Sequence, residues 1–167
     1  MTKKLAIIDS DNKEIIAAIE KYFECKDVEI QVVNQLDEKF DLVVLTGFES
    51  EFKINTNCSI LNLYPSILPA FKGGEPVKDA FLAGVKVSGV TVHVVETDKF
   101  YGKILAQYPV LIGNTTHIDE FAQELFAVSK KLYPVVIEAV LNDKVFDFTD
   151  LFKSSCGGNC GGCGGCH

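Results

Sequence analysis

Residues whose chemistry could serve a function gather in two places, around Asn62 and in the last dozen residues. Asn62 can both donate and accept hydrogen bonds, and it lies in a short apolar run typical of a buried strand. The segment that follows contains Pro65 and Pro69, and His93 lies on the next valine-rich segment. Because ligands of open α/β sheets bind outside the carboxyl ends of the strands, Asn62 and His93 are candidates to line a pocket. The alternative is that Asn62 only satisfies backbone groups of the loop.

The second cluster has the spacing Cys-x3-Cys-x2-Cys-x2-Cys-His and consists of Cys156, Cys160, Cys163, Cys166 and His167. Four thiolates complete either a cubane iron–sulfur cluster or a tetrahedral zinc site, and the intervening glycines let a short chain fold around the metal. The sequence therefore predicts an iron–sulfur cluster or zinc at this tail, with His167 as an additional or alternative ligand. A thiol relay that forms disulfides and a flexible tail without a ligand are the other interpretations.

The composition narrows the classes of protein to which the chain can belong. The net charge is −7, which disfavours binding to the phosphate backbone of nucleic acids. No run of about 18 apolar residues is present, so no membrane-spanning helix is expected. The apolar stretch after Met1 is too short for a signal peptide, which predicts a cytoplasmic protein. The hydrophobic fraction of 47% is enough for one well-packed core.

Alternating strand and helix patterns must position these residues. Strands are expected over residues 4–9, 28–33, 41–45, 59–63, 86–96 and 104–112. Helices are expected after a cap at Asp11 or Asn12, over residues 75–82, and from near Thr116, where Glu120 lies in capping range of His117. This order predicts an α/β fold, a Rossmann-like and mostly parallel sheet flanked by helices. The composition changes at Ser154, which divides the chain into a domain over residues 1–153 and a Cys/Gly-rich, metal-binding tail over residues 154–167.

Five ordered motifs carry a resemblance to a known family. The run Asn-Leu-Tyr-Pro-Ser-Ile-Leu-Pro-Ala-Phe-Lys-Gly at residues 62–73 resembles the signature loop of folate-dependent formyltransferases, and its ending is similar to the glycinamide ribonucleotide branch. Residues 41–48, 84–93, 102–107 and 132–137 continue the resemblance in the expected order. It extends from about residue 5 to residue 141, and it implies the formyltransferase fold.

The resemblance also implies a chemistry and a set of site residues. In that family 10-formyltetrahydrofolate delivers a formyl group to an amine, with an asparagine, a histidine and an aspartate shaping the reaction. By position, Asn62 matches the asparagine, Tyr64 stands in place of the histidine, and Phe100 stands in place of the aspartate. Catalytic roles are therefore assigned to Asn62, Tyr64 and His93. The residues expected to contact the cofactor are Leu45, Gly47, Phe48, Pro65, Ser66 and Leu68.

Three departures from the family pattern bear on function. A phenol has an ordinary pKa near 10, which makes Tyr64 a poor proton shuttle, and Phe100 has no ionisable group. Asp9 and Asp11 place carboxylates where the family binds a phosphate.

Three functional interpretations follow from these residues. The first is a formyltransferase homologue with a degenerate active site, a small-molecule ligand and a metal-binding tail. The second is an active transferase of altered specificity, in which Asn62, Tyr64 and His93 suffice. The third is a module for metal or redox delivery, whose tail meets a protein partner. The sequence does not indicate an oligomeric state.

Overall fold

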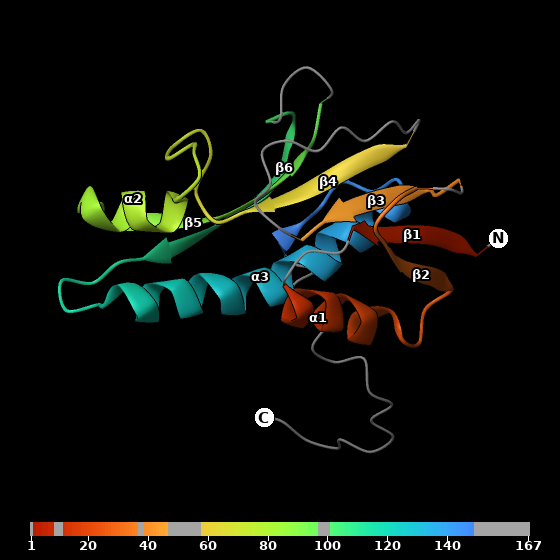
Figure 1. The fold of residues 1–167 in the computed structure, drawn as a ribbon, viewed down its shortest axis with the longest axis horizontal. Helices are drawn as coiled ribbons and strands as arrows, with labels where there is room; N and C mark the ends of the chain where they lie inside the picture. The colour runs from red at the N-terminus through yellow and green to blue at the C-terminus, as the bar shows by residue number, and fades with distance from the viewer. Residues whose placement is uncertain (1, 9–11, 37–38, 47–57, 97–100, 149–167) are drawn as a thin grey trace, which may run out of the picture.

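The computed structural model describes residues 2–8, 12–36, 39–46, 58–96 and 101–148. In this part of the chain a six-stranded sheet has the order β2-β1-β3-β4-β5-β6 (Figure 1). The strands are β1 (Lys3–Ile8), β2 (Val28–Val33), β3 (Leu42–Leu45), β4 (Ser59–Tyr64), β5 (Val87–Val94) and β6 (Ile104–Leu111). Each strand lies within two residues of its predicted bounds.

The sheet is parallel over its first half and antiparallel over its second. Strand β1 pairs in parallel with β2 and β3, and β3 pairs in parallel with β4. Strand β5 then runs antiparallel to both β4 and β6. The predicted class, a Rossmann-like and mostly parallel sheet flanked by helices, is confirmed for this mixed sheet.

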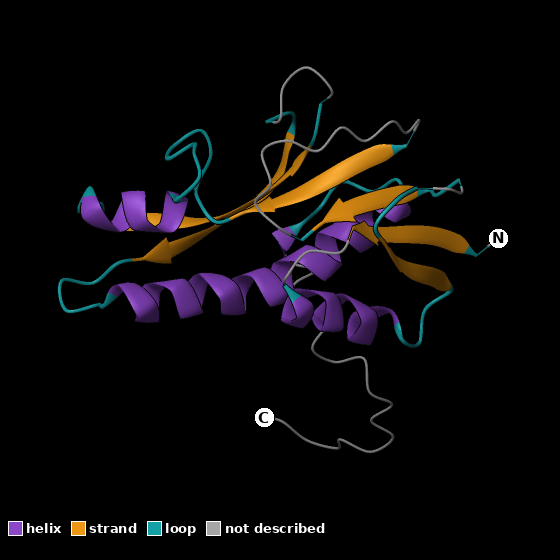
Figure 2. Ribbon diagram, viewed as in Figure 1, coloured by secondary structure: helices purple, strands orange, loops and turns teal. Residues whose placement is uncertain are grey.

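Helices α1 (Lys13–Phe23) and α3 (Ile118–Leu141) lie against the same face of the sheet, and the short α2 (Pro76–Leu82) leads into β5 (Figures 1 and 2). The predicted capping contact of α3 is present, because the His117 backbone N–H donates to Glu120 Oε2 at 3.1 Å. Asn12 stands at the N-cap of α1, but its side chain makes no cap hydrogen bond. It donates instead to the Thr46 carbonyl, and so links the start of α1 to the end of β3.

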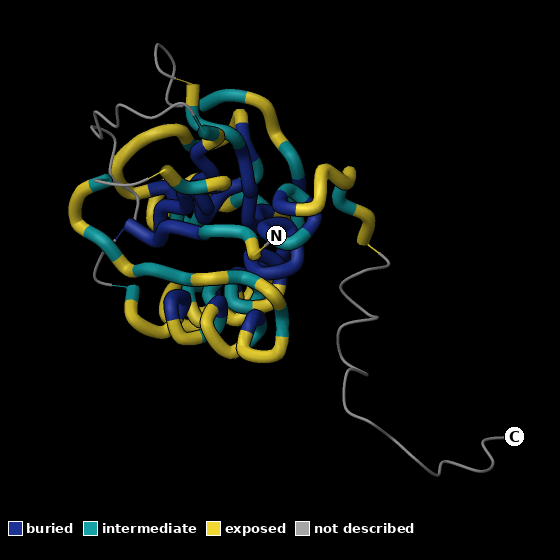
Figure 3. The backbone as a smooth tube through the Cα atoms, turned by 90° about the vertical axis from the view of Figure 1, so that its right-hand side faces the viewer, coloured by how far each residue is buried: buried dark blue, intermediate teal, exposed yellow. Residues whose placement is uncertain are grey.

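The two faces of the sheet have separate cores because strand side chains alternate. Leu5, Val44, Leu61 and Val92 belong to the core shared with α1 and α3, together with the apolar side of both helices. Ala6, Val43, Leu45 and Ile60 form a smaller cluster on the opposite face. Figure 3 shows the buried positions gathered in the interior of the fold and many exposed positions on its outer turns.

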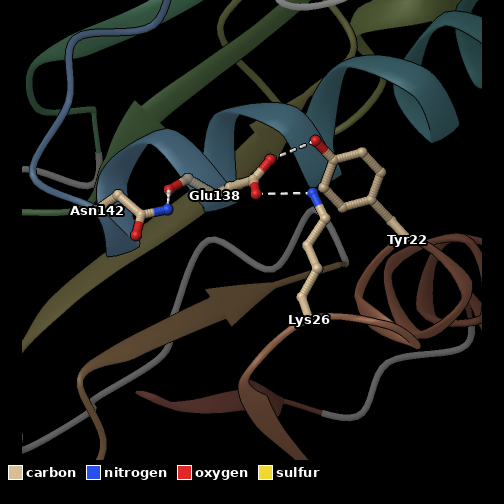
Figure 4. A network of polar contacts seen from close by, with 4 residues as sticks. All are labelled: Tyr22, Lys26, Glu138 and Asn142. Carbon is tan, nitrogen blue, oxygen red and sulfur yellow. Dashed lines mark hydrogen bonds and ion pairs between the residues drawn. The ribbon is translucent and has the colours of Figure 1, made fainter. Parts of the chain in front are cut away.

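Polar contacts at the edge of the larger core fasten α1 to α3. Tyr22 donates a hydrogen bond to Glu138 Oε2 at 2.5 Å, and the Lys26 ammonium lies 2.7 Å from Glu138 Oε1 (Figure 4). The same ammonium lies 3.7 Å from the centre of the Tyr22 ring, which adds a cation–π contact. Within the described segments, none of the helices is both long and apolar enough to cross a membrane.

Candidate functional site

Asn62 and His93 meet across the antiparallel pairing of β4 and β5. The two residues are directly opposite in the register, so their side chains share one face of the sheet. Since Leu61 and Val92 face the helices, Asn62 and His93 lie on the other face. The Asn62 Nδ2 and His93 Nε2 atoms are 3.2 Å apart, and both residues are 0% exposed.

The surroundings of His93 fix the roles of all four polar atoms in the pair. His93 Nδ1 lies 3.1 Å from the Val94 carbonyl, and a carbonyl can only accept, so Nδ1 carries a proton. Burial lowers the pKa of His93 below its ordinary value, although the Val94 carbonyl opposes the shift, so the ring is neutral near pH 7. Nε2 is therefore an acceptor, and the Asn62 amide donates to it. Asn62 Oδ1 is left buried without a hydrogen-bond partner.

Tyr64 does not stand free to act on a substrate, because its hydroxyl fastens the loop that follows. The hydroxyl faces the Gly73 and Phe71 carbonyls at 2.8 and 3.1 Å, and it accepts from the Gly73 N–H at 2.8 Å. Phe71 has φ of 52°, a left-handed conformation that these contacts help to hold. Burial, above the smaller effects of its partners, raises the pKa of Tyr64 to about 12.

Tyr101 packs beside Tyr64 and His93, although it was not among the residues predicted from the sequence. Its ring centre lies 5.4 Å from that of Tyr64 and 5.8 Å from that of His93, and its hydroxyl lies 3.4 Å from the Tyr64 hydroxyl. The Lys72 ammonium lies 5.2 Å from the centre of the Tyr101 ring. The available signal was its place between Phe100, which is predicted to stand at the position of the family aspartate, and Gly102, which is predicted to match the family glycine.

The residues assigned to cofactor contact at the end of β4 take part in a fixed loop. Ser66 donates to the Ala70 carbonyl at 2.6 Å, and its own carbonyl accepts from the Thr91 hydroxyl at 2.6 Å. The Leu68 N–H donates to Thr91 Oγ1 at 3.1 Å, and the Leu68 carbonyl accepts from Gln107 at 2.8 Å. Thr91 and Gln107 were not predicted, although strand alternation places Thr91 on the same face as His93.

Pro65 and Leu45 are buried beside this loop and at the end of β3. The Leu45 carbonyl is occupied, since it accepts from the Tyr133 hydroxyl of α3 at 2.9 Å. Cofactor contact by Leu45, Pro65, Ser66 and Leu68 stays a prediction.

Several predicted residues lie outside the described part of the chain. They are Asp9 and Asp11, predicted for the phosphate position, Gly47, Phe48 and Phe100, predicted for the pocket, and Cys156, Cys160, Cys163, Cys166 and His167, predicted as metal ligands. Their roles stay predictions. Among the residues that the structure does describe, no group of three or more His, Cys, Asp or Glu side chains is arranged to hold a metal ion.

Comparisons with known proteins agree with this architecture. The family model described as Formyl transferase matches residues 14–137. The phosphoribosylglycinamide formyltransferase of Bacillus subtilis is 42% identical over 82 residues, which are 49% of this chain and 42% of that protein. The Mycobacterium tuberculosis enzyme of the same name is 35% identical over 104 residues, 60% of this chain and 48% of that protein.

A solved structure extends the likeness to the whole fold. Glycinamide ribonucleotide transformylase 1 from Symbiobacterium toebii superposes with a TM-score of 0.73 at 20% identity, covering 88% of this chain and 92% of that one. The curated relatives match over less than half of their own length, whereas the family match spans most of this chain. The chain therefore belongs to the formyl transferase family.

Proposed function

We propose that this chain is a formyltransferase homologue with a degenerate active site, which does not catalyse the standard formyl transfer of purine synthesis. The observation that carries the proposal is that the Tyr64 hydroxyl is occupied by contacts within the protein. It stands where the family has a histidine, and its hydroxyl is fully engaged with Gly73, Phe71 and Tyr101. The pocket retains the family's asparagine without the proton-handling side chain beside it.

The ionisable groups around Asn62 are poorly suited to transfer protons near neutral pH. With a pKa of about 12, Tyr64 stays protonated and is a weak acid at pH 7. His93 has a pKa closer to the working range, but its ring is fully buried, and both nitrogens have partners in Asn62 and the Val94 carbonyl. Catalytic groups act as a unit, so the loss of one is not made good by another at a different position.

The pair offers little stabilisation to the formyl oxygen of the family's donor. A formyl oxygen is an acceptor that needs a donor to stabilise the charge it gains in the tetrahedral intermediate. The Asn62 amide donates one of its two N–H groups to His93, which leaves a single N–H for a formyl oxygen, and Oδ1, the atom of Asn62 that lacks a partner, is itself an acceptor. Because no proton-handling group stands beside that N–H, we assign no step of formyl transfer to this pair.

Incubation with 10-formyltetrahydrofolate and glycinamide ribonucleotide tests the proposal. Release of tetrahydrofolate, followed by absorbance, is expected to stay at the level of a blank without protein. The Bacillus subtilis phosphoribosylglycinamide formyltransferase, assayed in parallel, is the positive control. Turnover by this chain within about tenfold of that control would contradict the proposal.

The pairing of Asn62 with His93 favours a second candidate, an active transferase of altered specificity. The Asn62 and His93 side chains are held 3.2 Å apart, and Asn62 pairs in the register with Leu45, one of the predicted cofactor residues. In this case the chain should bind 10-formyltetrahydrofolate, and Asn62→Ala should abolish the binding. Absence of binding at millimolar folate, measured by equilibrium dialysis, would remove this candidate.

We also propose that the tail binds an iron–sulfur cluster or zinc through Cys156, Cys160, Cys163 and Cys166, with His167 nearby. Support comes from the soft-ligand spacing in the sequence. Elemental analysis and an absorption spectrum of anaerobically purified protein distinguish the two metals, since a cluster absorbs in the visible range and zinc does not. Protein with all four cysteines changed to serine is the control, and equal metal content in both would overturn the assignment.

A further inference from the structure

The Asn62–His93 pair is sealed from solvent, and Tyr101 is one of the side chains that cover it. Both members of the pair are 0% exposed, while the Tyr101 ring packs at 5.8 Å from the His93 ring and at 5.4 Å, edge to face, from the Tyr64 ring. A ligand that touches Asn62 or His93 must therefore displace a side chain. Tyr101 is partly exposed and so is the candidate whose removal opens the site from outside.

The position of Tyr101 is fixed by its neighbour in the chain. The Gly102 N–H donates to the Val94 carbonyl at 3.0 Å, and Val94 N–H donates to the Lys103 carbonyl at 2.8 Å. A Cβ atom on Gly102 would lie 2.5 Å from the Val94 carbonyl oxygen, so only glycine allows this close approach to β5. The backbone beside Tyr101 is thus held against the strand that carries His93.

The side chain that pairs with His93 has a polar atom whose hydrogen bonding is incomplete. Asn62 Oδ1 is buried without a partner, and the hydrogen bonds of His93 fix the amide so that Oδ1 cannot exchange places with Nδ2. A buried acceptor without a donor costs about 1–3 kcal/mol, so a ligand that brings an N–H or O–H recovers energy there. A ligand that brings only a carbonyl does not.

We propose that Tyr101 is the specificity-determining residue of this site: its ring closes the Asn62–His93 pair to ligands, and Asn62 Oδ1, the unpartnered acceptor of that pair, selects a small aromatic ligand that bears a hydrogen-bond donor. This inference rests on the proposed function and names the ligand class of the same degenerate site. Its test uses binding of fragments and not turnover, so it can fail while the absence of formyl transfer stands.

The experiment compares two probes of similar size on three forms of the full chain. Phenol carries an O–H donor, and fluorobenzene does not. Tyr101→Ala removes the ring, and Tyr101→Phe keeps it while removing the contact with the Tyr64 hydroxyl. We expect Tyr101→Ala to bind phenol at least about tenfold more tightly than wild type or Tyr101→Phe, because a ring-sized apolar space is available to be filled.

The donor requirement is tested in the opened variant. Phenol should bind Tyr101→Ala about fivefold more tightly than fluorobenzene, the contribution of one hydrogen bond. Phenol, but not fluorobenzene, should also shift the side-chain amide resonance of Asn62 in a nitrogen-labelled sample. Adding Asn62→Leu to Tyr101→Ala should abolish the preference for phenol. If Tyr101→Ala does not fold, Tyr101→Leu provides a smaller opening with the same order of affinities.

Two results would overturn the proposal. Equal binding of phenol by wild type, Tyr101→Phe and the opened variant would show that Tyr101 does not control access. Equal binding of phenol and fluorobenzene by the opened variant, with no change at the Asn62 amide, would show that Oδ1 does not select the ligand.

Discussion

The Tyr64 hydroxyl makes contacts that a histidine at this position could not reproduce. Removing this hydroxyl should therefore lower the stability of the folded protein. Tyr64→Phe leaves the Gly73 N–H without its acceptor and loosens the turn at Phe71. We expect a loss of about 1–3 kcal/mol in the free energy of unfolding, measured by urea denaturation. Tyr108→Phe is the matched control at a half-buried tyrosine on β6, expected to change stability by less than about 0.5 kcal/mol. Similar losses for the two variants would contradict this role.

The raised pKa of Tyr64 adds a prediction at high pH. A group whose pKa is about 12 in the folded state and about 10 in the unfolded state binds more protons when folded over this interval. Its stabilising effect is complete below pH 10 and is lost as the pH rises toward 12. Stability should therefore fall more steeply between pH 10 and 12 for wild type than for Tyr64→Phe. If the stability of the two proteins falls in parallel between pH 10 and 12, this prediction is wrong.

His93 should have the opposite dependence, at acid pH. Its pKa is lowered by burial, so the folded state holds the neutral ring while the unfolded state takes up a proton near pH 6.5. The contribution to stability is complete above that pH and is lost as the pH falls below it. Thermal unfolding of His93→Gln should therefore depend less on pH below 6.5 than that of wild type. An unchanged profile for His93→Gln would refute the argument.

At the scale of elements, α1 and α3 are held together by a buried apolar seam and by Glu138 at its edge. Burial opposes ionisation of Glu138, but hydrogen bonds from Lys26 and Tyr22 outweigh it and hold the pKa of the carboxyl below its ordinary value (Figure 4). Glu138→Gln should lower stability by about 0.5–1 kcal/mol at pH 7, a modest value because the pair is one-third exposed. The difference from wild type should shrink as the pH falls below about 4.5, where the carboxylate is protonated in the unfolded state.

A second ion pair between the same helices supplies the control. Lys130 and Glu14 also join α3 to α1, at 3.0 Å, but the Glu14 side chain is 70% exposed. Glu14→Gln should change the urea midpoint less than Glu138→Gln does. The reverse order would show that the contact at Glu138 is not the one that fastens α1 to α3.

The elements themselves could be predicted closely because each has a local signal. Apolar runs marked the strands, and Glu120 marked the start of α3, as the structure confirms. The pairing order could not be predicted in the same way. Strand β5 turns antiparallel to β4 after a long connection, and the sheet register that sets Asn62 opposite His93 comes from packing of both strands against α3. The position of Asn12 before α1 predicted a side-chain cap. Its side chain instead donates a hydrogen bond to the Thr46 carbonyl.

On the scale of the whole molecule, the candidate site contains residues that a family motif predicts and residues that only the packing of the fold brings to it. Residues 62–73 predicted where Asn62 and the fixed loop lie, since the motif is contiguous in sequence. Tyr101 was missed because nothing in its local sequence shows that its ring fills the space beside Tyr64 and His93. Such neighbours lie far apart along the chain, and only the folded sheet brings them together.

The last prediction concerns the proposed boundary between a domain and a tail at Ser154. Near the end of the described residues, the half-buried Phe146 packs edge to face with the exposed Phe148 at 5.3 Å, and Phe148 also contacts the Tyr108 ring of β6. Removing residues 154–167 takes away glycine and cysteine but none of these apolar contacts. The melting temperature of the truncated chain should therefore stay within about 2 °C of wild type, whereas Phe146→Ala, the control at a side chain packed against the core, should lower it by several degrees.

The same truncation separates the two parts of the proposed function. Metal content after anaerobic reconstitution should fall to background in the truncated protein, while fragment binding to a Tyr101→Ala version of it should be unchanged. If truncation instead lowers the melting temperature as far as Phe146→Ala does, residues 154–167 belong to the folded domain, and the boundary at Ser154 is wrong. If the truncated protein keeps its metal, the ligands lie elsewhere in the chain, because a tail that carries all of them cannot leave the metal behind.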